Sequence, residues 1–219
     1  MSIIIKNLGC TNYFNTWQNM KYFIDQSPTK DELWITEHKP IFTTGVNKKN
    51  TLPPKTDIPH LFVDRGGKIT YHGPGQLIIY TLFDIKKNNM TIRQLVSILE
   101  NSIIDFLKIN GINSYSKKQA PGVYVEGKKI CSIGLRIKKN YSYHGLSFNI
   151  DMDTKPFTII NPCGFNGLKM AQLSDFGIKS TVVKSGKQIA LIIKKKLKDH
   201  YEQNNNCLLY TSDAADESS

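Results

Sequence analysis

The segment from Thr91 to Ile109 constrains the fold more than any other part of this 219-residue chain. Thr91 and Gln94 form a T-x-x-Q capping box at its start, and Gly111 follows its end, where helices commonly stop. An apolar stripe of this length must be buried against other elements. The segment therefore predicts a core helix. The stripe consists of Ile92, Leu95, Val96, Leu99, Ile103, Phe106 and Leu107.

Strand patterns occur on both sides of this helix. Those before it cover 32–37, 61–63, 68–71 and 77–83, and those after it cover 122–125, 129–137 and 143–150. Glu126–Lys128 predicts a hairpin turn, and two further helices are predicted at 15–26 and from 185 to about 200. Strands and helices interspersed in this way predict an α/β or α+β fold, with a mixed central sheet flanked by helices. The length fits a single domain.

The end of the chain differs in composition from the rest. Residues 207–219 contain no Lys, Arg, Ile or Asn, which are frequent elsewhere. We therefore expect residues 1–206 to form the folded domain and 207–219 to be an anomalous tail outside it.

The chain is strongly basic, with 29 Lys and Arg against 18 Asp and Glu, or a net charge of +11. Only Arg65, Arg93 and Arg136 are arginines, the residue usually favoured for reading nucleic acid. Solvated lysine, with a contribution from codon bias, and a docking surface for an acidic protein both remain open, and nucleic acid is the least favoured partner. No apolar run is long enough to span a membrane and no secretory signal is recognisable. We expect a cytoplasmic protein with no nucleic-acid or membrane partner.

The segment from Arg65 to Gln76, RGGKITYHGPGQ, has the densest functional character. Its glycines let backbone N–H groups approach a ligand closely, although its spacing matches neither a P-loop nor a dinucleotide fingerprint. Two ordinary turns around a strand are the structural alternative. The segment from Tyr143 to Asn149, YHGLSFN, repeats its Tyr-His-Gly triplet, so the two segments can line one pocket. Each histidine alone fits a hydrogen-bonded core position, substrate positioning or proton transfer.

The cysteines are Cys10, Cys131, Cys163 and Cys207, and they form no C-x-x-C pair. We therefore expect neither a zinc site nor a disulfide framework. Cys163 lies between Pro162 and Gly164 in a turn-forming segment, which leaves two alternatives, a nucleophile and a buried structural thiol. A nucleophilic thiol needs a nearby cation or helix N-terminus to lower its pKa.

Four motifs together resemble the lipoyl (octanoyl) transferase family: RGGKITYHGPGQ at 65–76, PGVYVEGKKICSIGLR at 121–136, YHGLSFN at 143–149 and NPCG at 161–164. The resemblance extends from about Asp31 to Asp175. It implies that residues 1–206 form one catalytic domain, similar to those of biotin and lipoate protein ligases. It also implies transfer of an octanoyl group from octanoyl-acyl carrier protein to a lysine of a lipoyl domain, with no cofactor and no metal. The implied acceptors are the lipoyl domains of 2-oxoacid dehydrogenase complexes and the glycine cleavage H protein, in the first step of endogenous lipoate synthesis.

The resemblance also implies the site residues. The catalytic pair falls on Cys163 as nucleophile and on Lys129 rather than Lys128 as its lysine. Since side chains alternate along a strand, Lys128 and Lys129 cannot both point into the site. An ATP-dependent lipoate or biotin ligase of the same fold is the alternative function. The implied substrate-binding residues are Arg65, Gly66, Gly67, Lys68, Ile69, Thr70, Tyr71, His72, Ser132, Ile133, Gly134, Gly145, Leu146 and Ser147.

Overall fold

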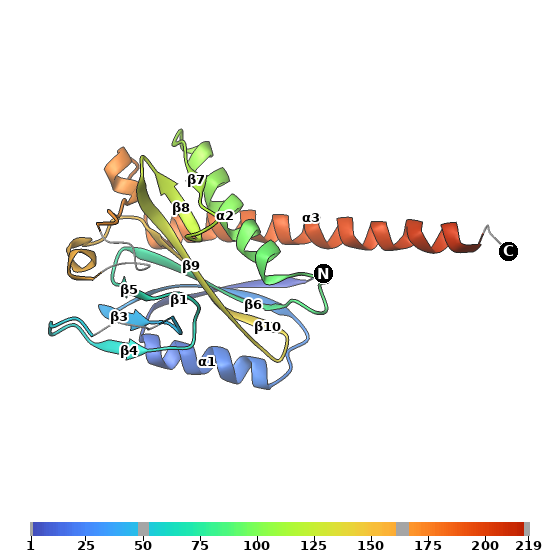
Figure 1. Ribbon diagram of the computed structural model, residues 1–219, viewed down its shortest axis with the longest axis horizontal. Coiled ribbons are helices and arrows are strands. Elements are labelled where there is room, and N and C mark those ends of the chain that lie inside the picture. The colour runs from blue at the N-terminus through green and yellow to red at the C-terminus, as the bar shows by residue number, and fades with distance from the viewer. Residues whose placement is uncertain (1, 48–52, 161–166, 217–219) are drawn as a thin grey trace.

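The computed structural model describes residues 2–47, 53–160 and 167–216, with side chains through residue 203. A seven-stranded sheet has the order β1-β2-β6-β10-β9-β8-β7, and a three-stranded sheet has the order β4-β3-β5 (Figure 1). The strands are β1 (Ile3–Thr11), β2 (Asp31–His38), β3 (Ile41–Thr44), β4 (His60–Phe62), β5 (Ile69–His72), β6 (Gln76–Asp84), β7 (Tyr115–Ser116), β8 (Gly122–Val125), β9 (Lys128–Lys138) and β10 (Tyr141–Asn149). The helices are α1 (Tyr13–Asp25), α2 (Ile92–Ile109) and α3 (Val182–Asp216), with 3-10 turns η1 (Lys155–Ile159) and η3 (Leu173–Phe176).

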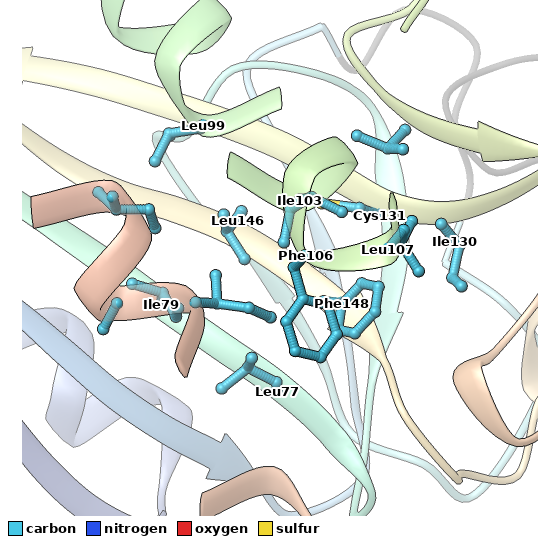
Figure 2. Close-up of a cluster of buried hydrophobic side chains, with 14 of the residues drawn as sticks. Leu77, Ile79, Leu99, Ile103, Phe106, Leu107, Ile130, Cys131, Leu146 and Phe148 are labelled. Carbon is cyan, nitrogen blue, oxygen red and sulfur yellow. The ribbon is translucent and has the colours of Figure 1, made fainter. Parts of the chain in front are cut away.

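The large sheet is covered on both faces. Ile79 of β6 belongs to a core with residues of α2 and α3, whereas its neighbour Ile78 packs in a second cluster with residues of α1. This division follows from the alternation of side chains along a strand. Figure 2 shows the first core, where the ring of Phe106 on α2 meets Phe148 of β10 edge to face, with 5.8 Å between ring centroids. The expected mixed sheet flanked by helices is therefore confirmed.

Helix α2 begins and ends as the sequence predicts. The amide of Gln94 donates to the Thr91 hydroxyl at 3.2 Å, and the Thr91 amide donates to the Gln94 side chain at 2.8 Å. This is the predicted capping box. Helix α1 begins at Tyr13, two residues earlier than predicted, because the side chain of Asn12 accepts from the Asn15 amide at 3.1 Å and caps it.

Three strands were not predicted from the sequence: β1, β3 and the two-residue β7. β1 pairs with β2 in parallel, and β3 lies in the middle of the three-stranded sheet. The irregular pairing between Asn7 and Cys10 interrupts the alternation that would have revealed β1. β3 lies directly after Pro40, in a stretch where no strand pattern was recognised.

Helix α3 is longer than predicted. It runs to Asp216 rather than to about His200, and its last turns extend beyond the sheet in Figure 1. The assignment of residues 207–219 to a tail outside the domain stays a prediction. Among the described residues, no helix is long and apolar enough to cross a membrane.

Candidate active site

A cavity of about 470 Å³ is formed where β5 and the loop before it meet β6, β9 and β10. Its volume lies in the range of small-molecule sites. All residues that the resemblance implies as substrate-binding line this cavity except Tyr71, and Lys129 lines it too. The remaining lining residues are Tyr13, Asn47, Ile78, Tyr80, Ile92, Val96, Gln119, Ala120, Pro121, Leu135 and His144.

Strand pairing brings these distant segments together. Gly145 of β10 lies opposite Gly134 of β9 on one side and Tyr80 of β6 on the other. The loop before β5 then docks on β9, because the Gly66 amide donates to the Leu135 carbonyl at 2.9 Å. A Cβ on Gly134 would lie 2.9 Å from the Gly66 carbonyl oxygen. The absence of a side chain at Gly134 therefore lets the loop cover the strand.

Tyr71 is the one implied binding residue that points elsewhere. Its ring contacts Phe42 and Phe157, at centroid distances of 5.3 and 5.6 Å, in a separate cluster of buried side chains. Its neighbours Thr70 and His72 line the cavity. Tyr71 therefore supports β5 from behind and does not touch the cavity.

Arg65 is buried and holds the loop to β3. Its guanidinium donates to the Thr43 carbonyl at 2.7 Å, to the Thr43 hydroxyl at 2.9 Å and to the Gly66 carbonyl at 3.0 Å. Charge-assisted hydrogen bonds of this kind are among the stronger contacts in proteins. Arg65 thus shapes the cavity wall as well as contributing a positive charge to it.

Asp64 joins this loop to α1 and β10. Its carboxylate accepts from Trp17 Nε1 at 2.9 Å, Tyr143 Oη at 2.8 Å and His144 Nε2 at 2.8 Å, and Lys21 lies 3.3 Å away. Burial alone would raise the pKa of Asp64, but the hydrogen bonds from His144 and Tyr143 outweigh it and hold the pKa well below its usual range. Burial lowers the pKa of His144 despite the opposing effect of Asp64. The pair is therefore a neutral imidazole donating to a carboxylate.

Two more buried histidines lie close to the cavity. His38 Nδ1 donates to the Thr11 carbonyl at 3.1 Å, so its Nε2 accepts from Tyr80 Oη at 2.6 Å. Burial lowers the pKa of His38 to about 4, and burial together with the positive surroundings lowers the pKa of His72 to about 3. Burial also raises the pKa of Tyr13, which stacks on His72, to about 12. The part of the cavity lined by His72, Tyr13 and Tyr80 is therefore polar but uncharged at neutral pH, apart from the Arg65 guanidinium.

Lys129 marks another part of the wall. Its side chain is 1% exposed, whereas Lys128 is only half-buried. Its Nζ lies 5.3 Å from the ring centroid of Tyr124, a cation–π contact. The backbone of Lys129 pairs with the segment that begins at Gly167, because the Lys129 amide donates to the Lys169 carbonyl at 2.9 Å. The cavity therefore contains one buried lysine on β9, and it is the one implied by the resemblance.

Gly122 provides the space for this lysine. Its φ of +137° is a conformation suited to glycine, and a Cβ there would lie 2.6 Å from Lys129 Cε and 3.2 Å from Nζ. Glu100 of α2 accepts from the Gly122 amide at 2.8 Å. Burial raises the pKa of Glu100, while that hydrogen bond and the charge of Lys129 lower it. Glu100 thus lies near enough to Lys129 to interact with its charge.

Cys163 lies outside the described residues, so its position relative to Lys129 is not part of this structure. Of the thiols that are described, Cys131 is fully buried and Cys10 is exposed. Burial raises the pKa of the Cys131 thiol well above its usual range, which suits a core residue and disfavours a thiolate.

Several residues of the site were missed by sequence reasoning. Tyr13 and Tyr80 belong to elements whose apolar patterns make them look like ordinary core residues. Asp64 and Glu100 bond to partners far away in the chain, so their spacing carries no signal. The conspicuous position of Asp64, immediately before the arginine and paired glycines, is the one local hint.

The fold defines the class of protein. A bipartite lipoate protein ligase from Thermoplasma acidophilum is similar with a TM-score of 0.69 and 15% identity, over 90% of this chain and 84% of that one. A lipoate-protein ligase A bound with ATP has a TM-score of 0.67 at 15% identity, covering 90% of this chain and 86% of that one. A biotin protein ligase from Aquifex aeolicus has a TM-score of 0.60 at 14% identity, covering 92% and 72%. The chain thus has the α/β fold of the lipoate and biotin protein ligases.

Sequence comparison narrows this class to a family. Residues 12–191 match the lipoyl protein ligase A/B catalytic domain. The octanoyltransferase of Shewanella baltica (strain OS223) is 48% identical over 196 residues, or 88% of this chain and 90% of its own length. The octanoyltransferase of Vesicomyosocius okutanii is 53% identical over 172 residues, which cover 77% of this chain and 84% of that protein. The chain belongs to the octanoyltransferase family, a family of acyltransferases.

Proposed function

We propose that this protein transfers an octanoyl group from octanoyl-acyl carrier protein to a specific lysine of a lipoyl domain, through a thioester on Cys163. The observation that carries the proposal is the buried Lys129 in the wall of a partly apolar cavity. Lys169, whose carbonyl pairs with the Lys129 amide, follows Cys163 by only six positions in the sequence (169 − 163). The chain therefore returns to Lys129 shortly after the proposed nucleophile.

The acyl chain binds against the apolar side chains that line the cavity. These include Ile69, Ile78, Ile92, Val96, Ile133 and Leu146. Burial of a methylene contributes about 0.8 kcal/mol, so an octanoyl chain gains on the order of 5 kcal/mol. This is enough to hold the acyl group while the donor is exchanged for the acceptor.

In the first half-reaction, the Cys163 thiolate attacks the thioester carbonyl of the donor. A bond from the Cys163 sulfur to the carbonyl carbon forms, and the bond to the carrier sulfur breaks. The ammonium of Lys129 gives a proton to the leaving carrier thiolate, and Lys129 is then neutral. The ammonium of Lys129 favours the thiolate, because a nearby cation lowers the pKa of a thiol. One thioester replaces another of similar energy, so this step needs no ATP.

In the second half-reaction, the amine of the acceptor lysine attacks the octanoyl thioester. An amide forms, the Cys163 thiolate leaves, and Lys129 in its neutral form takes the proton of the attacking amine. Backbone N–H groups near Gly134 or Cys163 are the candidates for stabilising the oxyanion. Lipoyl domains of 2-oxoacid dehydrogenase complexes and the glycine cleavage H protein are the proposed acceptors, in the first step of endogenous lipoate synthesis.

Intact mass spectrometry tests this proposal. Mixing the protein with octanoyl-acyl carrier protein should add one octanoyl group, which peptide mapping should place on Cys163. Cys163→Ala and Cys163→Ser should fold normally but form no acyl-enzyme, and Cys131→Ala is the matched control that should still be acylated. A Cys163→Ala protein that transfers octanoate at near wild-type rate would refute the mechanism.

A second arm separates this function from the ATP-dependent ligases that share the fold. The protein is mixed with free octanoate, ATP, magnesium and a lipoyl domain, and both pyrophosphate release and octanoylation are measured. We expect neither above background. Pyrophosphate release together with octanoylation of the lipoyl domain would instead assign a ligase.

A further inference from the structure

A second hollow, of about 810 Å³, adjoins the cavity and is strongly basic. We call it the basic hollow. Four of its lining residues are lysines, and Glu126 is its one carboxylate among the described residues. Its lining residues are Lys117, Lys118, Gln119, Ala120, Tyr124, Glu126, Gly127, Lys128, Gly167, Leu168 and Lys169.

These lysines are distinguished by their grouping around one concavity. Lys6, Lys21, Lys138, Lys139 and Lys196 each form an ion pair with a carboxylate. In the described part of the chain, no such ion pair involves the four lysines of the basic hollow or most of the other lysines. Four ammonium groups around one concavity repel one another, so an anion bound there would relieve the repulsion.

The basic hollow and the cavity are connected. Gln119 and Ala120 line both of them. The ring of Tyr124 contacts a lysine of each, with Lys117 Nζ 4.5 Å and Lys129 Nζ 5.3 Å from its centroid. The backbone pairing of Lys129 with Lys169 fixes a further lysine of the hollow beside the catalytic lysine. A ligand with its reacting carbonyl at Lys129 can therefore extend directly into the basic hollow.

The proposed donor has the matching chemistry. A carrier protein presents its acyl group as a thioester on a flexible arm, and a phosphodiester joins that arm to the protein. Lysine binds phosphate as a point charge. The concave shape and volume suit a small-molecule segment better than a flat protein surface. An acidic face of a lipoyl domain would need an open surface instead.

We infer that the basic hollow binds the phosphodiester of the donor's arm while the acyl chain occupies the cavity. This inference rests on the proposed function, since it assigns the donor of that reaction a second point of contact. The site would let the enzyme recognise a carrier-bound thioester before the acyl group reaches Cys163.

The test compares two small donors, octanoyl-4′-phosphopantetheine and octanoyl-pantetheine, which differ in the phosphate. For the wild type we expect a higher kcat/KM with the phosphorylated donor. In the triple variant Lys117→Gln, Lys118→Gln, Lys169→Gln, the ratio of the two kcat/KM values should fall by about tenfold, as expected when partly solvated charge contacts are lost. All three lysines are exposed, so the variant should fold.

The matched control is Lys187→Gln, Lys195→Gln, Lys198→Gln, which removes the same charge from exposed positions on α3. It should keep the wild-type ratio. If the ratio of kcat/KM values fell equally in both triple variants, the effect would come from overall charge and the site would be refuted. An unchanged ratio in the Lys117, Lys118 and Lys169 variant would also refute it. A higher KM for the lipoyl domain with an unchanged donor ratio would assign the hollow to the acceptor instead, and would also overturn the inference.

Calorimetric titration with 4′-phosphopantetheine, which carries no acyl group, keeps this test separate from catalysis. We expect binding to the wild type and to the α3 control, and weaker binding to the first triple variant. Failure of octanoyl transfer with intact binding would refute the proposed function alone. Intact transfer without phosphate-dependent binding would refute the basic hollow alone.

Discussion

His144 Nε2 donates a hydrogen bond to Asp64 Oδ1 at 2.8 Å, and this contact fastens the loop before β5 to the centre of the large sheet. His144 has a φ of +59°, an uncommon conformation for a residue with a side chain. The same carboxylate accepts from Trp17 on α1. One side chain therefore sets the position of the cavity wall relative to two other elements.

We predict that Asp64→Ala destabilises the fold. The change leaves His144 Nε2 buried without its acceptor, and it removes the acceptor of Trp17 as well. Hydrogen bonds to a charged group stabilise the fold, although the partial exposure of Asp64 weakens their effect. We therefore expect the free energy of unfolding to fall by about 2 kcal/mol. Urea unfolding measures it, with the exposed Asp57→Ala as control, which should stay within about 0.5 kcal/mol of wild type. Equal stabilities for the two variants would show that the Asp64 contacts contribute little.

The buried histidines predict a stability that depends on pH. The pKa of His38 is about 4 and that of His72 about 3 in the folded protein, compared with about 6.5 in an unfolded chain. The stabilisation is therefore fully present above pH 6.5 and is lost as pH falls towards the folded pKa values. For each histidine, the free energy of unfolding should fall by about 2 kcal/mol as the pH is lowered from 7 to 5.

Urea unfolding of the wild type and His38→Gln at pH 7, 6 and 5 checks this prediction. The variant should be less stable than the wild type at pH 7, because the hydrogen bond from Tyr80 Oη to His38 Nε2 is replaced. Its free energy of unfolding should fall between pH 7 and pH 5 by about 2 kcal/mol less than that of the wild type. Parallel curves for the two proteins would mean that His38 takes up no additional proton on unfolding.

Local patterns predict some parts of this structure and not others. The capping box and apolar stripe of α2 were readable because both depend on residues within the helix. The cavity-lining segment Arg65–His72 was recognisable from its glycine-rich motif, and Gly145–Ser147 from the repeated Tyr-His-Gly triplet. The Asp64 contacts to Trp17 and His144 were not, because each joins residues far apart in the sequence. The polar roles of Tyr13 and Tyr80 were hidden for the same reason.

Lys129 and Lys128 should differ sharply in function. Lys129 is buried in the cavity wall and Lys128 is half-buried at the rim of the basic hollow. Removal of the Lys129 ammonium should raise the pKa of the Cys163 thiol and nearly stop transfer, since both half-reactions use it. Lys128→Ala should stay close to wild type at saturating donor, because a solvated charge contributes little.

The measurement is the pH dependence of Cys163 alkylation, followed by peptide mapping, together with octanoyl transfer in both variants. An inactive Lys128→Ala beside an active Lys129→Ala would show that the wrong lysine has been assigned.

The size of the cavity predicts selectivity for the length of the acyl chain. A four-carbon chain buries four fewer methylenes than an octanoyl chain, which weakens binding by about 3 kcal/mol, or about a hundredfold. A sixteen-carbon chain would exceed the apolar lining and meet the polar groups of Tyr13, Tyr80 and His72. Transfer rates from carriers loaded with four, eight and sixteen carbons measure this selectivity. Equal rates would indicate an open groove instead of a bounded cavity.

Glu100 should act as a positioning residue for Lys129, through both its charge and its hydrogen bond to Gly122. Glu100→Gln keeps an acceptor for the Gly122 amide but removes the negative charge. Loss of that charge destabilises the ammonium form of Lys129 and lowers its pKa, so the pH profile of octanoyl transfer should move to lower pH. Glu100→Ala removes the acceptor as well, and should also lose about 1 kcal/mol of stability.

The two variants separate the electrostatic contribution of Glu100 from its structural one. Transfer is measured from pH 6 to 9 at saturating donor, and stability is measured by urea unfolding. A shifted profile in Glu100→Gln, with near wild-type stability, is the expected result, because the backbone at Gly122 keeps the space that Lys129 Cε and Nζ occupy. If the profile of Glu100→Gln coincided with that of the wild type while Glu100→Ala lost stability and activity together, Glu100 would serve only to hold the Gly122 backbone in place.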